Sequence, residues 1–172
     1  VSSTRVYGES AGERVDDDTS PQPSDAQGQV LLNMETLWQQ AYPSECVIVR
    51  PTGIYGTSVA RMIKLAGTTK SYPKLHWSNR IHVDDLAAFL AHLLHVEHTE
   101  KSYICSNSQP LPLHEIMQWF QQQLGLPVLV LESDVPSGKQ IYATRMQQMN
   151  FELQHPHCFD DYLALLAERE SK

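Results

Sequence analysis

The sequence predicts an α/β protein with a parallel sheet covered by helices, and three observations support this class. Residues 46–49 form a short unbroken apolar run, typical of a parallel strand that is buried on both faces. Helical patterns separate the strand candidates, and alternating strands and helices indicate an α/β fold. Only three or four strand candidates are visible, so we expect that further strands of the sheet are missing upstream of Val1.

The first half of the chain contains two strand candidates around one helix. Residues 1–6 are rich in β-branched side chains and break into a turn, so they are predicted to form a strand parallel to 46–49. Residues 9–28 are polar and rich in turn residues, which predicts a surface loop. Residues 29–42 have helical apolar spacing, and Pro43 ends the helix: the apolar positions are Val30, Leu31, Met34, Leu37, Trp38 and Ala41.

The second half continues the alternation. Helices are predicted where apolar residues recur every three or four positions, and strands where short apolar runs occur. Gly67 is expected to end the first of these helices, and Pro112 to begin a later one that Gly125 stops. The predicted helices are 58–66, 86–94, 112–124, 143–149 and 158–168, and the extended segments are 81–83, 102–105 and 128–131.

Composition excludes several function classes. The formal charge is −7, with 20 acidic against 13 basic residues and no basic run, so nucleic acid is not expected as a partner. No stretch approaches the roughly 20 apolar residues that span a bilayer, so no membrane partner is expected. Three widely spaced cysteines without a CxxC motif predict free thiols, and together with the lack of a signal peptide they indicate a cytoplasmic location: Cys46, Cys105 and Cys158.

Six segments of the chain resemble motifs of one protein family, in that family's order. They are 2–8 (SSTRVYG), 23–35, 49–56 (VRPTGIYG), 80–87 (RIHVDDLA), 103–106 (YICS) and 124–127 (LGLP). Together they span nearly the whole chain and resemble the extended and atypical short-chain dehydrogenases/reductases of the NAD-dependent epimerase/dehydratase type. Members of this type act on nucleoside-diphosphate sugars.

The resemblance implies the domain organisation. It indicates the C-terminal portion of a Rossmann-like, doubly wound parallel sheet with a small α/β substrate lobe, without the N-terminal strands. Residues 1–100 would form the distal half of the NAD(P)-binding domain, including part of the substrate lobe around 57–80, and residues 101–172 the C-terminal substrate lobe. The chain opens without Met on a strand end, so we expect it to be a fragment.

The catalytic positions depart from the family pattern. The resemblance implies that Ser3, with Thr4 beside it, is the catalytic hydroxyl. The family's Tyr and Lys, spaced Tyr-x-x-x-Lys on one helix face, are replaced by Gln27 and Leu31, and none of the seven tyrosines has a Lys four residues later. Glutamine cannot ionise and leucine has no donor, so proton transfer through such a pair is not expected. Thr4 and Arg5 also replace the Asp-Glu of the family's dehydratases.

The resemblance also implies ligand-binding residues. The nicotinamide-side loop would contribute Pro51, Thr52, Gly53 and Ile54, and the substrate side Arg61 and Arg80. The family's phosphate-binding arginine maps onto Ser78, and Arg80 lies out of that register. The chain contains no GxGxxG phosphate cradle, so NAD or NADP is expected in the intact parent protein, and this chain alone is expected to bind weakly or not at all.

Three functional hypotheses remain open at this point. The first is an atypical NAD(P)-binding epimerase/dehydratase-like protein that acts on a nucleotide sugar or a related small metabolite. The second is a non-catalytic nucleotide-binding or sensor protein of the same fold. The third, a metal enzyme using His92, His95 and His98, is weak because this spacing rotates the third ligand away, and we therefore assign no metal site. We also expect a homodimer through helix 29–42.

Overall fold

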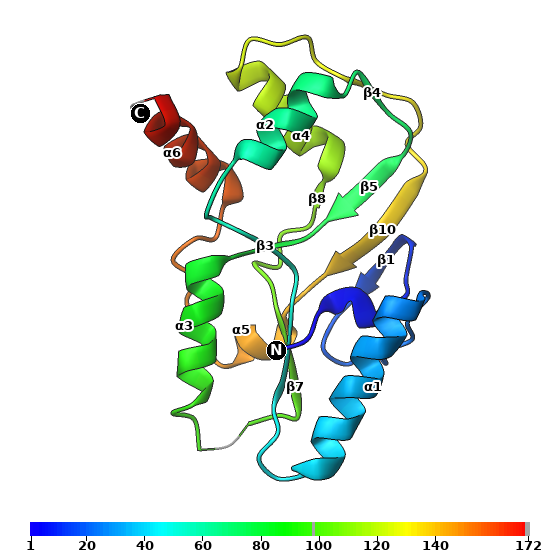
Figure 1. The fold of residues 1–172 in the computed structure, drawn as a ribbon, viewed down its shortest axis with the longest axis vertical. Helices are drawn as coiled ribbons and strands as arrows, with labels where there is room; N and C mark the ends of the chain where they lie inside the picture. The colour runs from blue at the N-terminus through cyan, green and yellow to red at the C-terminus, as the bar shows by residue number, and fades with distance from the viewer. Residues whose placement is uncertain (98, 171–172) are drawn as a thin grey trace.

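The computed structural model describes residues 1–97 and 99–170 and shows an elongated α/β molecule (Figure 1). Parallel strand pairs dominate its sheets, and the one antiparallel pair described joins β5 (Leu75–Ser78) to β8 (Leu111–Pro112). The fold agrees with the predicted α/β class. In the described part of the chain, no helix has both the length and the apolar character needed to cross a membrane.

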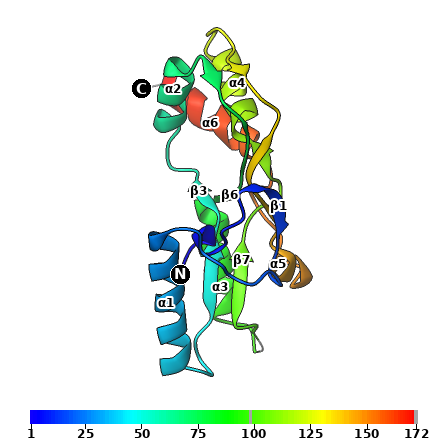
Figure 2. The same cartoon turned by 90° about the vertical axis from the view of Figure 1, so that its right-hand side faces the viewer.

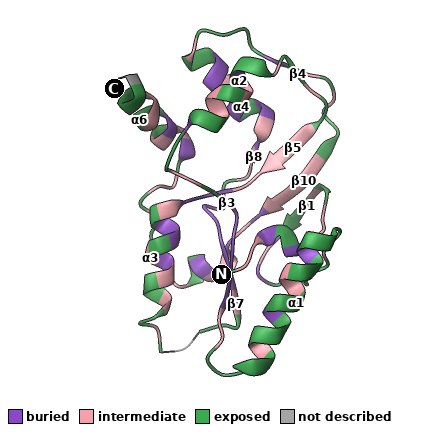
Figure 3. Cartoon of the chain, in the orientation of Figure 1, coloured by how far each residue is buried: buried purple, intermediate pink, exposed green. Residues whose placement is uncertain are grey.

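One half of the molecule is built on the parallel pair β2 (Ile48–Pro51) and β7 (Ser102–Cys105). Helix α1 (Ala26–Ala41) lies on one side of this pair and α5 (Thr144–Gln148) on the other (Figure 2), with α3 (Val83–Leu93) alongside. The strand interiors are buried whereas α1 is largely exposed (Figure 3). The first apolar cluster fills this half and includes Val6, Val49, Phe89, Ile104 and Met146.

The other half contains a four-stranded sheet in the order β1–β10–β5–β8. Strands β1 (Ala11–Val15) and β10 (Pro136–Ile141) pair in parallel, and β10 also pairs in parallel with β5. A second apolar cluster joins three helices: α2 (Ala60–Thr68), α4 (Leu113–Gln123) and α6 (Cys158–Glu170). A short parallel pair, β4 (Ser71–Tyr72) with β9 (Val130–Leu131), lies at the outer end (Figure 1).

A third parallel pair connects the two halves. Strand β3 (Gly53–Tyr55) follows β2 after Thr52, and β6 (Arg80–His82) leads into α3. The imidazole of His82 caps α3 by accepting a hydrogen bond from the backbone N–H of Asp84. The β3–β6 pair therefore carries the chain from the first sheet to the second, and the candidate site forms beside it.

Two predictions for the first 28 residues are wrong. Residues 4–6 form a short 3₁₀ helix, η1 (Thr4–Val6), instead of continuing a strand, because the Ser3 hydroxyl caps the turn by accepting from the backbone of Arg5. The segment does run beside β2, through one hydrogen bond from the Ser2 N–H to the Val49 carbonyl. The expected loop 9–28 contains β1, which pairs with a strand more than a hundred residues away, and its last residues begin α1.

The remaining differences concern boundaries. Helix α2 continues through Gly67 to Thr68, since Gly67 does not adopt the left-handed conformation with which a glycine ends a helix. Only the last two residues of the predicted strand 128–131 pair, as β9. Strand β7 pairs with β2 in the first half of the molecule, and β1 pairs with β10 in the four-stranded sheet.

Candidate functional site

A cavity of about 270 Å³ lies where the two halves of the molecule meet. Its walls come from β3, α2, the segment from β5 to β6, α4 and α6, so that both the strand end after β2 and the helical layer contribute. We call it the arginine cavity, because both arginines predicted to bind substrate, Arg61 and Arg80, line it. Its lining residues include Gly53, Ile54, Tyr55, Arg61, Ser78, Asn79, Arg80 and Tyr162.

Arg80 is the central cation of this cavity. Its side chain is held by neutral oxygens: Nε donates to the Tyr162 hydroxyl at 2.6 Å, and Nη1 donates to the Ser78 hydroxyl at 2.8 Å. The residue is only 8% exposed, yet no carboxylate forms an ion pair with it in the described part of the chain. Burying a charge without a counterion is unfavourable, so the cavity is suited to an anionic ligand.

The other predicted ligand-binding residues divide into two groups. Arg61 is exposed on the first turn of α2, and Gly53 and Ile54 border the same cavity. Pro51 and Thr52 are buried instead, and the Thr52 hydroxyl donates to the carbonyl of Cys105. Of the four residues predicted to bind cofactor, only Gly53 and Ile54 therefore present surface that a nicotinamide could contact.

The predicted catalytic hydroxyls lie at η1. The Ser3 side chain caps this turn, and Thr4 is buried with its hydroxyl donating to the carbonyl of Pro51 at 3.3 Å. The N-terminal turn of α1 packs against η1, because a Cβ added at Gly28 would lie 2.7 Å from the Arg5 carbonyl oxygen. The N-cap Asp25 also pairs with Arg5, which fixes the two elements together.

The two positions of the missing Tyr–Lys pair differ in environment. Gln27 is exposed on the first turn of α1, whereas Leu31 packs against the first apolar cluster. A leucine side chain that contributes to the core cannot replace an ammonium that holds ribose hydroxyls. The residues present thus fit an apolar contact with a nicotinamide but not the usual contact with its ribose.

Sequence reasoning did not identify a hydrogen-bonded chain beside the arginine cavity. The Tyr55 hydroxyl donates to Asp161 Oδ2 at 2.6 Å, and the other oxygen of this carboxylate lies 2.6 Å from His155 Nδ1. Burial, followed by the contact with Asp161, raises the pKa of Tyr55, and the bond to Asp161 raises the pKa of His155. Because Tyr55 and Asp161 are 106 residues apart, no local pattern could have revealed this chain.

A possible metal-ligand group involves other histidines than the sequence suggested. Potential ligand atoms of His82, Asp84 and His155 lie within 4.8 Å of one another. The two imidazole rings stack face to face, with centroids 3.6 Å apart, so their in-plane lone pairs do not converge on one ion. His92 lies beside Phe151, and the third member of the predicted histidine series, His98, lies outside the described residues.

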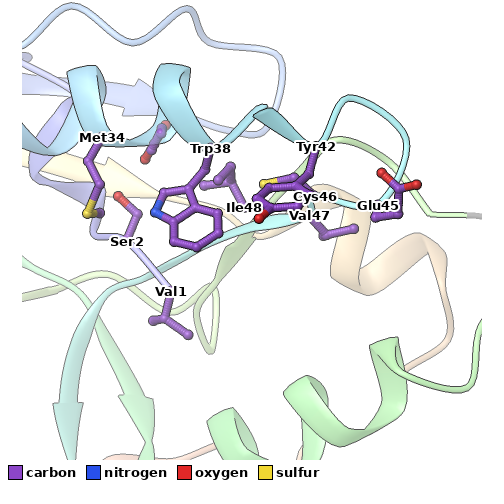
Figure 4. A pocket seen from close by; sticks show the side chains of 10 residues that line it. Val1, Ser2, Met34, Trp38, Tyr42, Glu45, Cys46, Val47 and Ile48 are labelled. Atoms are coloured by element: carbon purple, nitrogen blue, oxygen red, sulfur yellow. The ribbon is translucent and has the colours of Figure 1, made fainter. Parts of the chain in front are cut away.

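A second, more open groove of about 510 Å³ lies between α1 and the start of β2 (Figure 4). Trp38 and Tyr42 stack on each other along it, at a centroid distance of 5.5 Å. Leu37, on the same helix, is 66% exposed. The groove offers mainly apolar surface and contains none of the predicted ligand-binding residues; it is lined by Val1, Ser2, Met34, Glu35, Trp38, Tyr42, Glu45, Cys46, Val47 and Ile48.

Comparison with known proteins identifies the fold. No family model matches the sequence, and no curated protein is significantly similar to it. Among solved structures, the chain is 35% identical to a protein from Methylobacillus flagellatus described as an NAD-dependent epimerase/dehydratase, with a TM-score of 0.84 over 98% of this chain and 63% of that one. A conserved protein of unknown function from Silicibacter pomeroyi DSS is 22% identical, with a TM-score of 0.76 over 97% and 64% of the two chains.

A third solved structure, the dTDP-glucose 4,6-dehydratase of Bacillus anthracis in complex with NAD, is 16% identical with a TM-score of 0.76 over 99% of this chain and 61% of that one. Other structures with this fold hold NAD or NADPH. The chain therefore has a Rossmann-like epimerase fold. It belongs to the extended short-chain dehydrogenase/reductase superfamily of the NAD-dependent epimerase type, and it spans about three-fifths of the length of these solved relatives.

Proposed function

We propose that the chain is the substrate-binding part of an atypical NAD(P)-binding epimerase/dehydratase-like protein, and that the arginine cavity binds the diphosphate of a nucleotide sugar. The observation that carries this proposal is the buried Arg80, which has only neutral hydrogen-bond partners. Charged hydrogen bonds to an anion would compensate its burial. Arg61, which lines the same cavity, would supply a second cation for a diphosphate.

The proposal assigns different roles to the other predicted residues. Gly53 and Ile54 would contact the nicotinamide end of NAD or NADP, which supplies hydride transfer when the intact protein binds it. Ser3 would be the remaining hydroxyl of the former catalytic set. Because Leu31 offers no donor and the chain has no phosphate cradle, we expect this chain alone to bind NAD(P) weakly or not at all.

Isothermal titration of the chain with UDP-glucose and dTDP-glucose tests the proposal. We expect Arg80→Met to weaken the binding of either ligand about 10- to 100-fold, because a hydrogen bond to a charged group contributes about 1.5–3 kcal/mol. Arg61→Met should have a smaller effect, since Arg61 is exposed. Arg14→Met, which removes an exposed arginine of β1, is the control. Equal affinity of the unaltered chain and the Arg80→Met variant would refute the proposal.

A non-catalytic nucleotide-binding or sensor protein is the second candidate function. The packing of Leu31 against the first apolar cluster favours it, because this partly buried side chain offers neither a charge nor a hydrogen-bond donor to a cofactor. The two candidates differ in turnover. If the intact protein binds NAD and nucleotide sugar yet never produces reduced nicotinamide or an epimerised product, the sensor function is supported, whereas turnover that is lost in a Ser3→Ala variant supports the enzyme.

A further inference from the structure

Two hydroxyl groups hold the guanidinium of Arg80, and both belong to side chains that line the arginine cavity. Arg80 Nε donates to the Tyr162 hydroxyl at 2.6 Å, and Nη1 donates to the Ser78 hydroxyl at 2.8 Å. A guanidinium has donors and no acceptor, so the hydroxyl oxygen is the acceptor in both bonds. Each hydroxyl therefore keeps its own hydrogen for a second partner.

The protein itself provides no acceptor for these two hydrogens. In the described part of the chain, neither the Tyr162 hydroxyl nor the Ser78 hydroxyl donates a hydrogen bond. Tyr162 is only 3% exposed, and burial raises the pKa of its phenol although the charge of Arg80 acts in the opposite direction. The phenol thus keeps its hydrogen at neutral pH. A buried donor without an acceptor is unfavourable, so this hydrogen favours a ligand that accepts it.

The neighbouring Tyr55 shows the opposite arrangement. Its ring lies edge to face with that of Tyr162, with centroids 5.3 Å apart, and it lines the same cavity. Its hydroxyl donates to Asp161 Oδ2 at 2.6 Å, so its hydrogen already has an acceptor inside the protein. Of these two tyrosines in the cavity wall, Tyr162 is therefore the one whose hydrogen is available to a ligand.

The lining of the arginine cavity matches an acceptor that carries negative charge. Its residues include two arginines, Arg61 and Arg80, and no carboxylate among the described residues. Each phosphate of a nucleoside-diphosphate sugar is a diester, which has one negative charge and no P–O–H hydrogen at neutral pH. Such a group only accepts hydrogen bonds, and the groups around Arg80 have N–H and O–H hydrogens to donate.

We propose that the hydroxyls of Tyr162 and Ser78 donate directly to phosphate oxygens of the ligand while their own oxygens accept from Arg80. This inference rests on the proposed function, which assigns the diphosphate to the arginine cavity. Accepting a hydrogen bond from a guanidinium polarises a hydroxyl and strengthens the bond that it donates. Tyr162 and Ser78 are then ligand-binding residues, and they do more than support the arginine.

Calorimetric titration with UDP-glucose tests the two hydroxyls. We expect Tyr162→Phe and Ser78→Ala each to raise the dissociation constant by about 10-fold, because each change removes one donor to a charged acceptor. Ser78→Thr retains a hydroxyl and should keep most of the affinity. Tyr142→Phe and Ser44→Ala are the matched controls, since both residues lie outside the cavity lining.

A second measurement separates a direct contact from mere support of Arg80. Site-specific replacement of Tyr162 by 3-fluorotyrosine makes the phenol a stronger donor and its oxygen a weaker acceptor, because fluorine withdraws electron density. At about pH 6, well below the ordinary tyrosine pKa of about 10, the phenol stays protonated. If its hydrogen binds phosphate, the dissociation constant for UDP-glucose falls. If Tyr162 only accepts from Arg80, the constant rises or stays the same, and that result overturns the proposal.

The outcomes also separate this inference from the proposed function. If Arg80→Met weakens the binding of UDP-glucose while Tyr162→Phe and Ser78→Ala bind like the unaltered chain, the hydroxyl ligands are refuted and the proposed function stands. If the unaltered chain does not bind UDP-glucose, the proposed function fails and this inference with it. Should Tyr162→Phe not fold, the two Ser78 variants and the fluorinated chain decide alone.

Discussion

The buried ion pair between Glu35 and Arg50 connects α1 to β2 and offers a sharp test of how η1 is held. Arg50 Nη2 lies 2.6 Å from Glu35 Oε2, and Nε lies 3.1 Å from Oε1. Nη1 donates to the Tyr7 hydroxyl at 2.8 Å, so the pair also fixes the residue that follows η1. The side chains of Glu35 and Arg50 are only 2% and 8% exposed.

Glu35→Ala would leave the Arg50 charge buried without its partner. Breaking a buried pair in this way destabilises a protein by about 3–5 kcal/mol. For a chain of this size we expect the midpoint of thermal unfolding to fall by about 6–20 °C, measured by circular dichroism. Glu45→Ala, at an exposed position after the same helix, should change stability by less than about 0.5 kcal/mol.

A double variant separates the charge effect from the loss of packing. Glu35→Leu with Arg50→Met removes both charges and retains apolar volume, so it should be considerably more stable than the sum of the two single changes predicts. If Glu35→Ala costs less than about 1 kcal/mol, or if the two single effects are simply additive, the pair is not the buried connection between α1 and β2 described above.

Two further predictions concern His155 and the face of α1. The bond to Asp161 raises the pKa of His155 in the folded chain, so its stabilising effect is fully present below about pH 6.5 and is lost as the pH rises through the raised value. The difference in the free energy of unfolding between the unaltered chain and His155→Gln, measured by urea titration, should therefore shrink from about pH 6 to about pH 8. A difference that stays constant over this range would contradict the prediction. Leu37 is 66% exposed on α1, the helix whose Met34 and Trp38 line the groove of Figure 4, and we predict a homodimer through α1 that Leu37→Glu dissociates in sedimentation experiments; a chain that is monomeric before the change would refute it.

Local patterns predicted those helices and strands whose apolar residues recur regularly within a short stretch of sequence. The apolar run 46–49 overlaps β2, and the helical spacing of 29–42 and 86–94 corresponds to α1 and α3. On α3 this spacing includes buried side chains such as Leu86 and Phe89, whereas on α1 most of the apolar positions are exposed, including Val30, Leu37 and Trp38. Strands β1 and β10 lack such a signal, since they are short, half-exposed and contain glycines. Their pairing joins segments more than a hundred residues apart, which no local window can detect.

The candidate site was predictable only where the motifs of the family reach. Arg61 and Arg80 were inferred from the resemblance, and the structure places both at one cavity together with Gly53 and Ile54. The hydrogen-bond partners of Arg80 could not be inferred from the sequence, because Tyr162 lies on a helix and is 82 residues away in the chain.

The most direct test of the central claim is a crystal structure of the chain soaked with UDP-glucose. We predict the diphosphate in the arginine cavity, with Arg80 donating to a phosphate oxygen through the N–H groups that do not bond to Tyr162 and Ser78. Density for the nucleotide in the groove beside α1 instead, with the arginine cavity empty and Arg80 unchanged, would contradict it.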